Sequence, residues 1–247
     1  MMSISAKCRS PRQPAHRNEL RGAPDSELRE RSPREALLRL VCTFVLGSTF
    51  LLLSAGPLRA ANWYDSNWTY RKKISIDSTD VPGTVTNFPV LVSITDTDLR
   101  DDAQNDGDDL LFTSDNGTTK LDHEIEAFDG ATGLLLVWVK VPTVSSSTDT
   151  DIFLYYGYAS ATNQENITGV WSNGYEAVYH LHDDFLDSTS NSRDGTNNGS
   201  VDSAALIGDG QDFIPVDDID LGTWSTSAVA GLTLQSWARY DDFDQND

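Results

Sequence analysis

Short runs of alternating hydrophobic and polar residues follow one another from residue 70 onward. Six runs have this character, at 70–76, 88–94, 109–113, 120–128, 134–141 and 151–156. Clusters of Gly, Asn, Asp, Ser and Thr separate them, and no long helical period is present. Regularly spaced short strands are typical of sandwiches and barrels. The pattern therefore predicts an all-β fold, an antiparallel β-sandwich.

The alternation also assigns side chains to faces. In the run 70–76, Tyr70, Lys72, Ile74 and Ile76 share one face. In the run 120–128, Leu121, His123, Ile125 and Ala127 share one face, whereas Asp122, Glu124 and Glu126 share the other. Since the side-chain period of a strand is two, this run predicts one packed and one solvated face. The run LLLVWVKV at 134–141 is apolar on both faces over most of its length, which predicts a central strand covered on both sides.

A different pattern occupies residues 1–60. Ten of the 18 basic residues lie there, and a charge-free stretch runs between Arg39 and Arg59, broken at Gly56-Pro57 and followed by Ala60 and Ala61. This is the layout of an export signal, with cleavage expected near Ala60. The length of the stretch also suits an uncleaved membrane anchor, so contact with a membrane is expected only through this leader. The predicted location is extracellular, periplasmic or in the cell envelope.

Charge separates the leader from the rest of the chain. The residues after position 60 hold 33 of the 38 acidic residues but only eight basic ones. Phosphate binding needs a basic face, so a nucleic-acid partner is excluded. Both cysteines, Cys8 and Cys42, lie in the leader. The remainder therefore has no disulfide, no thiol nucleophile and no thiolate metal site.

Several phrases between residues 63 and 166 carry a resemblance. They are NWYDSNWTYRKKISID, TNFPVLVSITDTDLRDDAQNDGDDLLFT and the stretch from KLDHEIEAF to the closing LYYGYASATNQEN. In this order they resemble a bacterial family known as domain of unknown function 2341. The resemblance implies a β-sandwich domain at 61–166, without an assigned activity.

A second resemblance begins after Asn166. The phrases YHL at 179–181, DSTSN at 187–191, DGT at 194–196 and SWA at 236–238 resemble the opening of a concanavalin A-like or laminin-G-like jelly roll. One departure is the sequence IGDG at 207–210, where many relatives have an aromatic residue. The resemblance implies a lectin-like domain at 171–247. These residues are too few for eight strands and their connections, so an incomplete jelly roll with unpaired strand edges is expected.

The stretch DDAQNDGDD at 101–109 is a candidate calcium loop. Calcium takes six to eight oxygen ligands, and an EF-hand would need a Glu where this register places Thr113. A standard EF-hand is therefore excluded, but Asp102, Asp106 and Asp108 could form a looser cage. The alternative is a solvated turn in which Asp and Asn side chains bond to their own backbone and Gly107 takes a positive φ.

The segment 187–191 is a second candidate for calcium. Jelly rolls of the laminin-G-like class often hold one calcium ion, so the resemblance implies Asp187 as a ligand with Asn191 supporting the loop. An Asx-turn without metal explains the same residues. Nearby Asp183, Asp184 and Asp194 either add ligands or repel one another in water.

Catalytic interpretations of the sequence are weak. His180 and His182 are two apart on an expected strand and precede acidic residues, which a metal site of two histidines and one carboxylate would need, but a structural polar patch explains them as well. Glu124 and Glu126 have a spacing that glycosidase carboxylates could use, yet a solvated acidic face accounts for them equally. No serine-nucleophile elbow, zinc motif or phosphate loop is present.

Aromatic residues are the remaining functional signal. They cluster at 63–70 and recur at Trp138, Tyr155, Tyr156, Trp171 and Tyr175. Exposed aromatic faces bind sugar rings, whereas buried ones build cores. The sequence thus predicts an exported, non-catalytic recognition module for glycans or surface polymers, within a larger protein and with calcium as a candidate cofactor. A ligand-free spacer in an adhesin and a targeting module for a hydrolase are the alternatives. Exposed aromatics would favour recognition, and buried aromatics would favour the spacer.

Overall fold

A computed structural model describes residues 5–6, 29–31, 62–182, 184–223 and 231–239. The chain divides into two compact units, one formed by residues 4–175 and the other mainly by residues 176–247. The charge-free stretch and both cysteines of the leader lie outside the described residues. In the part of the chain that the structure describes, no helix is long and apolar enough to cross a membrane.

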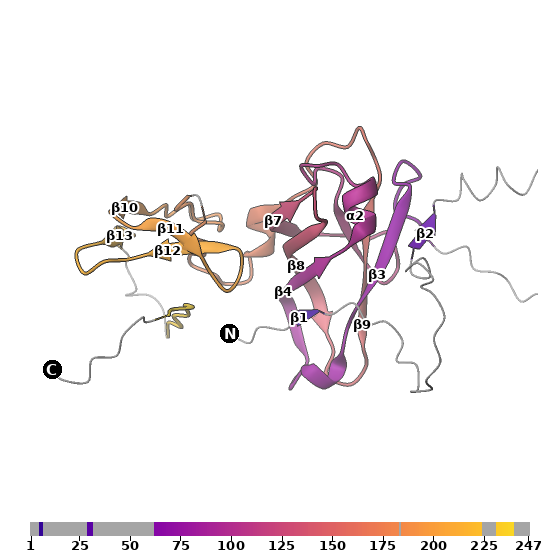
Figure 1. The fold of residues 1–247 in the computed structure, drawn as a ribbon. Coiled ribbons are helices and arrows are strands. Elements are labelled where there is room, and N and C mark those ends of the chain that lie inside the picture. The colour runs from indigo at the N-terminus through magenta and orange to yellow at the C-terminus, as the bar shows by residue number, and fades with distance from the viewer. Residues whose placement is uncertain (1–4, 7–28, 32–61, 183, 224–230, 240–247) are drawn as a thin grey trace, which may run out of the picture. The chain divides into compact units, whose positions relative to one another are not determined.

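The first unit is a sandwich of two β-sheets (Figure 1). One sheet has the order β1-β4-β8-β7, formed by Ser5–Ala6, Val85–Thr95, Leu134–Val144 and His123–Asp129. The other has the order β2-β3-β9-β5-β6, formed by Arg29–Arg31, Tyr70–Ile76, Thr150–Tyr156, Leu111–Ser114 and Lys120–Leu121. All neighbouring strands run antiparallel except β1 and β4. The all-β fold and the antiparallel sandwich predicted from the sequence are confirmed.

All six predicted runs form strands. The run at 120–128 is divided at Asp122 into β6 and β7, and β7 carries a bulge between Ile125 and Ala127. The doubly apolar run becomes β8, which lies between β4 and β7 as the sequence predicts for a central strand. The structure adds the helices α2, Thr97–Asp102, and α3, Ile167–Val170, and a short 3-10 helix, Ser78–Asp80. They are too short to show a hydrophobic period.

The core lies between the two sheets. Alternate residues of β8, including Val137 and Val139, belong to one buried cluster with Ile74 of β3 and Leu154 of β9, and each of these four side chains is at most 1% exposed. Burying a side chain of this size contributes about 1.5–3 kcal/mol. The inward positions are those that the period of two predicts.

The second unit consists of two-stranded ribbons among its described residues. In one, β10, Thr196–Asn198, pairs with β13, Asp218–Asp220, and in the other β11, Val201–Ala204, pairs with β12, Asp209–Asp212. Among the described residues each of these strands has one hydrogen-bonded neighbour, and the expected incomplete jelly roll with unpaired edges stays a prediction. These ribbons are not the packed sheets of a jelly roll, and the lectin-like interpretation stays a prediction.

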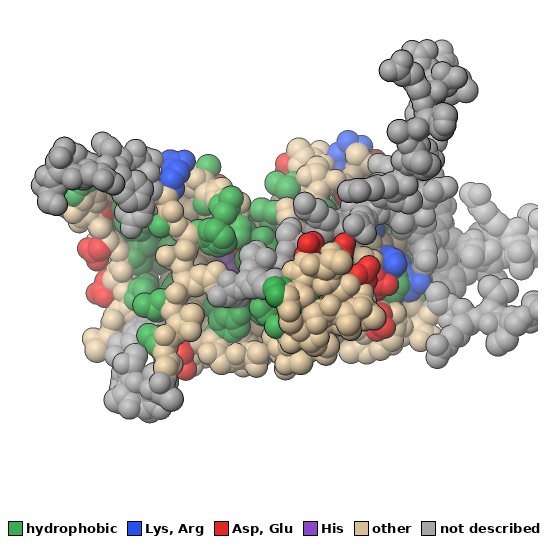
Figure 2. Space-filling model, turned by 90° about the horizontal axis from the view of Figure 1, so that it is seen from below, with side chains coloured by type: hydrophobic (Ala, Val, Ile, Leu, Met, Phe, Trp, Pro, Cys, Tyr) green, Lys and Arg blue, Asp and Glu red, His purple; other side chains and the backbone are tan. Residues whose placement is uncertain are grey.

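Large hydrophobic side chains are exposed in this second unit, and hydrophobic surface is visible in Figure 2. Val216 is 80% exposed and Trp237 is 64% exposed. In the first unit, by contrast, Ile167 is the one large hydrophobic residue of this class among the described residues. The two units therefore differ in how completely each buries its own apolar side chains.

Candidate functional site

The acidic stretch 101–109 is organised around its last aspartate. Asp109 is 0% exposed, and its carboxylate accepts hydrogen bonds from three backbone N–H groups. The Gln104 amide donates at 2.9 Å, and the Gly157 and Tyr158 amides donate at 2.6 and 3.0 Å. The backbone carbonyl of Asp109 also accepts a bond from the indole of Trp68 at 2.7 Å. Asp109 thus fastens the loop before β5 to the chain that leaves β9.

Burial and hydrogen bonding have opposite effects on the Asp109 carboxyl. Removal from water raises the pKa, and the three backbone N–H groups lower it. The net result is a pKa above the ordinary value for aspartate. The loop lies in a tightly closed region, because a Cβ at Gly107, whose φ is +78°, would approach the side chains of Ile125 and Phe128 to 3.2 Å.

The three aspartates predicted as calcium ligands in this loop, Asp102, Asp106 and Asp108, are less buried than Asp109. Asp102 is the last residue of α2 and is half-buried. Asp106 is exposed, and its carboxylate accepts a bond from the Asp108 amide at 3.2 Å, which is an Asx-turn. Together with the positive φ of Gly107, these contacts are those of the solvated turn that the sequence offered as the alternative.

Asp187 and Asn191 also bond within their own segment. Both carboxylate oxygens of Asp187 are used: they accept from the amides of Val178, Thr189 and Arg193 at 2.9–3.0 Å and from the Thr189 hydroxyl at 2.9 Å. Burial raises the pKa of Asp187, but these donors outweigh it and hold the pKa below its usual value. The Asn191 side chain donates to the carbonyl of Glu176 at 2.9 Å.

Calcium at these two loops stays an untested prediction of the sequence, whereas the contacts favour the alternative, self-bonded turns. No group of three or more His, Cys, Asp or Glu side chains within the described ranges is arranged to hold a metal ion. A ligand that binds only the folded state raises Tm by mass action. We expect the same Tm in EDTA and in millimolar calcium. A calcium-dependent rise that Asp187→Ala or Asp106→Ala removes would contradict this expectation and locate the ion.

Glu124 and Glu126 do not lie on a solvated face, so that prediction is wrong. They are 6% and 9% exposed. The carboxylate of Glu124 accepts a hydrogen bond from the indole of Trp171, and that of Glu126 accepts one from the indole of Trp138 at 2.9 Å. The two indole rings meet edge to face with their centroids 5.4 Å apart. Glu124 thus binds a segment that covers the sheet, and Glu126 binds Trp138 of β8, whose ring contacts that segment.

The cover is the segment 166–175, which lies on the outer face of the β4-β8-β7 sheet. Lys140 on β8 donates to the carbonyl of Gly169 at 2.9 Å and to the hydroxyl of Ser172 at 2.6 Å. The Asn166 side chain donates to Asp122 at 2.8 Å. This role of Lys140 was not predictable from the sequence, because its partners lie about 30 residues further along the chain.

The outer face of the other sheet is covered by residues 62–68. The ring of Trp63 meets the Tyr155 ring edge to face at 5.3 Å, and Tyr64 and Trp68 pair in the same way at 5.5 Å. Beneath them the Arg71 guanidinium lies 4.3 Å from the Phe153 ring centre, a cation–π contact. Arg71 is 3% exposed, and it donates to the carbonyl of Asn62 at 2.7 Å.

His180 and His182 do not lie on a strand, contrary to the sequence-based expectation. Both are half-buried in an irregular segment of the second unit. The Nδ1 atom of His182 lies 3.3 Å from a carboxylate oxygen of Asp209, so an ion pair forms there when the imidazole is protonated. The regular same-side placement that a strand would impose is absent.

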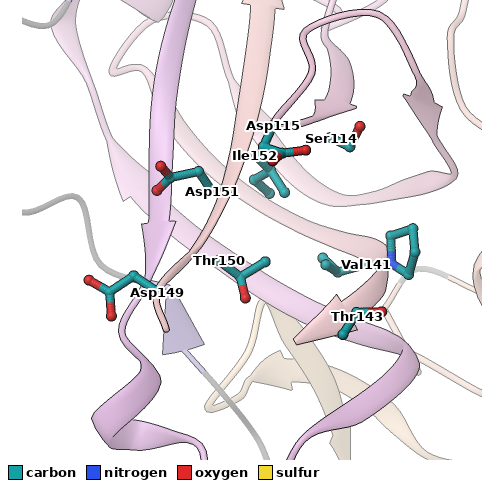
Figure 3. Close-up of a pocket in the computed structure, with 9 residues that line it drawn as sticks. Ser114, Asp115, Val141, Thr143, Asp149, Thr150, Asp151 and Ile152 are labelled. Atoms are coloured by element: carbon teal, nitrogen blue, oxygen red, sulfur yellow. The ribbon is translucent and has the colours of Figure 1, made fainter. Parts of the chain in front are cut away.

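A pocket of about 350 Å³ opens at the end of the sandwich where β5 and β8 finish and β9 begins (Figure 3). Its floor includes Val141 and Ile152, and Thr143, Thr150 and Ser114 supply hydroxyl groups. Asp115, Asp149 and Asp151 also line it.

Two of these three carboxylates are occupied by the protein itself. Asp149 accepts bonds from the amide and hydroxyl of Ser78, and Asp151 pairs with Lys73 at 3.2 Å. In Figure 3 both point away from Val141 and Thr143. Asp115, which is exposed, is the remaining acidic group of the lining.

Comparison with known families gives one match. Residues 106–198 match the model of the Domain of unknown function (DUF2341). The match shares residues 106–166 with the range over which the sequence resembles this family, and it continues beyond the first unit. The family has no assigned function, so the match identifies a relationship and no activity. No curated protein and no solved structure matches the chain.

Proposed function

We propose that the chain belongs to an exported protein and that residues 62–175 act in it as a non-catalytic structural module. One observation carries this proposal: both outer faces of the sandwich are covered by the chain's own aromatic segments, 62–68 and 166–175. Trp68 and Trp171 are 5% and 3% exposed, and Tyr155 is 0% exposed. Rings that are packed in this way do not form a platform for sugars.

Two further features support the same function. The carboxylates that the sequence offered for catalysis accept hydrogen bonds from indoles: Glu124 from Trp171 of the cover, and Glu126 from Trp138 of β8. The leader pattern and the acidic composition of the remainder support export, since a net negative charge keeps an exported domain soluble. A module of this kind holds neighbouring parts of a larger protein in place, as a spacer does.

A second candidate function is recognition of a glycan or surface polymer, and the end pocket favours it. Its volume lies within the range of small-molecule sites, and it combines an apolar floor with hydroxyl groups and the Asp115 carboxylate. Hydroxyl and carboxylate groups can exchange hydrogen bonds with sugar hydroxyls. Asp149 and Asp151 already bond to Ser78 and Lys73, so these two carboxylates are less available to a ligand in the pocket.

A binding screen separates the two functions. The full chain is applied to a glycan array and titrated with soluble polysaccharides, beside the variants Asp115→Ala and Asp106→Ala. Asp115 lines the pocket, whereas Asp106, which is also exposed, lies in the loop before β5, is not among the pocket-lining residues, and serves as the matched control. We expect no saturable binding. Saturable binding that Asp115→Ala removes and Asp106→Ala keeps would replace the structural function with recognition.

A further inference from the structure

A lysine lies on the inner face of the sandwich. Lys72 of β3 shares its face with Ile74 and Ile76, as alternation requires, and its side chain is only 7% exposed. Its ammonium group pairs with the carboxylate of Asp96 and lies 3.4 Å from that of Asp98. Asp96 directly follows β4, a strand of the opposite sheet. The contact therefore joins the two layers of the sandwich.

The Asp96 carboxyl is held in place before any reaction. Asp96 is the N-cap of α2, and its Oδ1 atom accepts a bond from the Asp98 amide at 2.8 Å. Its own amide donates to the carbonyl of Gly133 at 3.0 Å. Gly133 has a φ of +76°, and a Cβ there would collide with the Asp96 carbonyl. These contacts leave Oδ2 as the oxygen that faces Lys72.

Such a pair is suited to condensation. Condensation needs the lysine as an amine and the aspartate as an acid, and one proton passed from the Lys72 ammonium to the Asp96 carboxylate that it contacts gives both. A neutral lysine amine is a nucleophile. Groups held in contact react with effective concentrations of roughly 10⁵–10⁸ M, which offsets the competition from water that prevents amide formation in solution.

We propose that the side chains of Lys72 and Asp96 become joined by an intramolecular amide bond, with Asp98 carrying the proton. The Nζ lone pair attacks Cγ of Asp96 and forms the new C–N bond. Asp98 accepts the proton that the nitrogen loses and passes it to the departing oxygen of Asp96. The C–O bond then breaks and one water molecule leaves. Ammonium plus carboxylate thus gives amide plus water, with no oxidant or reductant.

The bond lies where the module needs reinforcement. In the β3–β9 pair, Tyr70 is opposite Tyr156, so the start of β3 and the end of β9 lie side by side at the same end of the sheet. Tension on the two flanking segments would peel these strands apart from that end. Lys72 is only two residues into β3. A covalent link there stops the peeling near its start. This inference rests on residues that the proposed function does not use.

Mass spectrometry of the purified full chain tests the proposal. Trypsin cleaves after Arg71, Lys73 and Arg100, so the peptide 74–100 contains Asp96. We expect this peptide to carry the dipeptide Lys72-Lys73 as a branch through Asp96, with the loss of one water molecule. A peptide 74–100 that is linear in the folded, purified protein overturns the proposal, because the contact is then only an ion pair. This mass measurement uses the wild-type chain, so it does not depend on whether a variant folds.

Variants assign the roles. Lys72→Arg, Asp96→Ala and Asp98→Ala are each expected to restore the mass of the missing water in the intact chain and to lower Tm. Lys73→Arg is the matched control, because the neighbouring Lys73 is exposed and pairs with Asp151 instead. It should keep the water loss. If Asp98→Ala keeps the water loss, the assignment of Asp98 as proton carrier is wrong.

Discussion

Replacing Asp109 by alanine is expected to lower the free energy of unfolding of the sandwich by about 3–5 kcal/mol. The change leaves the amides of Gln104, Gly157 and Tyr158 without their acceptor in a buried place. Each buried donor left unsatisfied costs about 1–3 kcal/mol, and the three share one site, so their costs do not simply add. Urea unfolding followed by tryptophan fluorescence measures the loss.

Two further variants sharpen this prediction. Asp109→Asn keeps the size but turns an amide donor toward backbone donors, so we expect an intermediate loss of about 2 kcal/mol. Asp106→Ala, in the same loop but exposed, should change stability by less than about 0.5 kcal/mol. An Asp109→Ala variant as stable as Asp106→Ala would show that Asp109 is not the anchor of the loop.

The second large effect is a loss of stability in mild acid caused by His123. Its imidazole is 0% exposed and packs against the Phe112 ring at 5.2 Å. Neither ring nitrogen has a well-formed hydrogen bond within the described residues, although the carbonyls of Leu121 and Leu110 lie close enough to raise its pKa slightly. Burial outweighs them and lowers the pKa from 6.5 to about 4, with Lys120 adding to the decrease and Asp122 opposing it.

The direction of the pH dependence follows from linkage. Below pH 6.5 the unfolded chain binds a proton at His123 that the folded protein does not bind until about pH 4. Stability from this group is therefore complete above pH 6.5, falls as the pH drops toward 4, and changes little below that. The shift corresponds to about 3 kcal/mol. Urea unfolding at a series of pH values measures it.

Carboxyl groups also titrate near the lower end of this range, and the raised pKa of Asp109 acts in the opposite direction. The informative quantity is thus the difference between the wild type and His123→Leu, which should lose the slope between pH 6.5 and 5. His182→Gln, in the second unit, should keep it. Equal slopes in the wild type and His123→Leu would mean that the imidazole is not buried in its neutral form.

The strands of the sandwich were predictable because their signal is local. A period of two over five to eight residues is enough to place β3, β4, β8 and β9, and the apolar run of β8 correctly indicates its central position. The division at Asp122 and the helix α2 were missed. A break of one residue in a strand and a helix of six residues are both too short to produce a recognisable hydrophobic period in the sequence.

The surroundings of the acidic residues could not be predicted, because their partners lie far along the chain. Glu124 is buried by an indole 47 residues away, and Asp109 is anchored by amides 48 and 49 residues away. The alternating pattern alone predicted that Glu124 is exposed to solvent. It also contained no signal that Asp109 is buried while Asp106 and Asp108 are not. From the sequence we expected that buried aromatic residues would favour a spacer function. In the first unit the aromatic residues are largely buried.

The measurement that tests the structural function most directly is the extension of single full-length molecules by their two ends. A module that holds other parts in place must keep its fold under tension. The sandwich has a continuous core between two sheets, whereas the described residues of the second unit form ribbons of only two strands, which are weakly stable alone. We predict that residues 62–175 open in one cooperative step, at a higher force than residues 176–247. Gradual extension of the sandwich, or opening at a lower force than the second unit, would contradict the account.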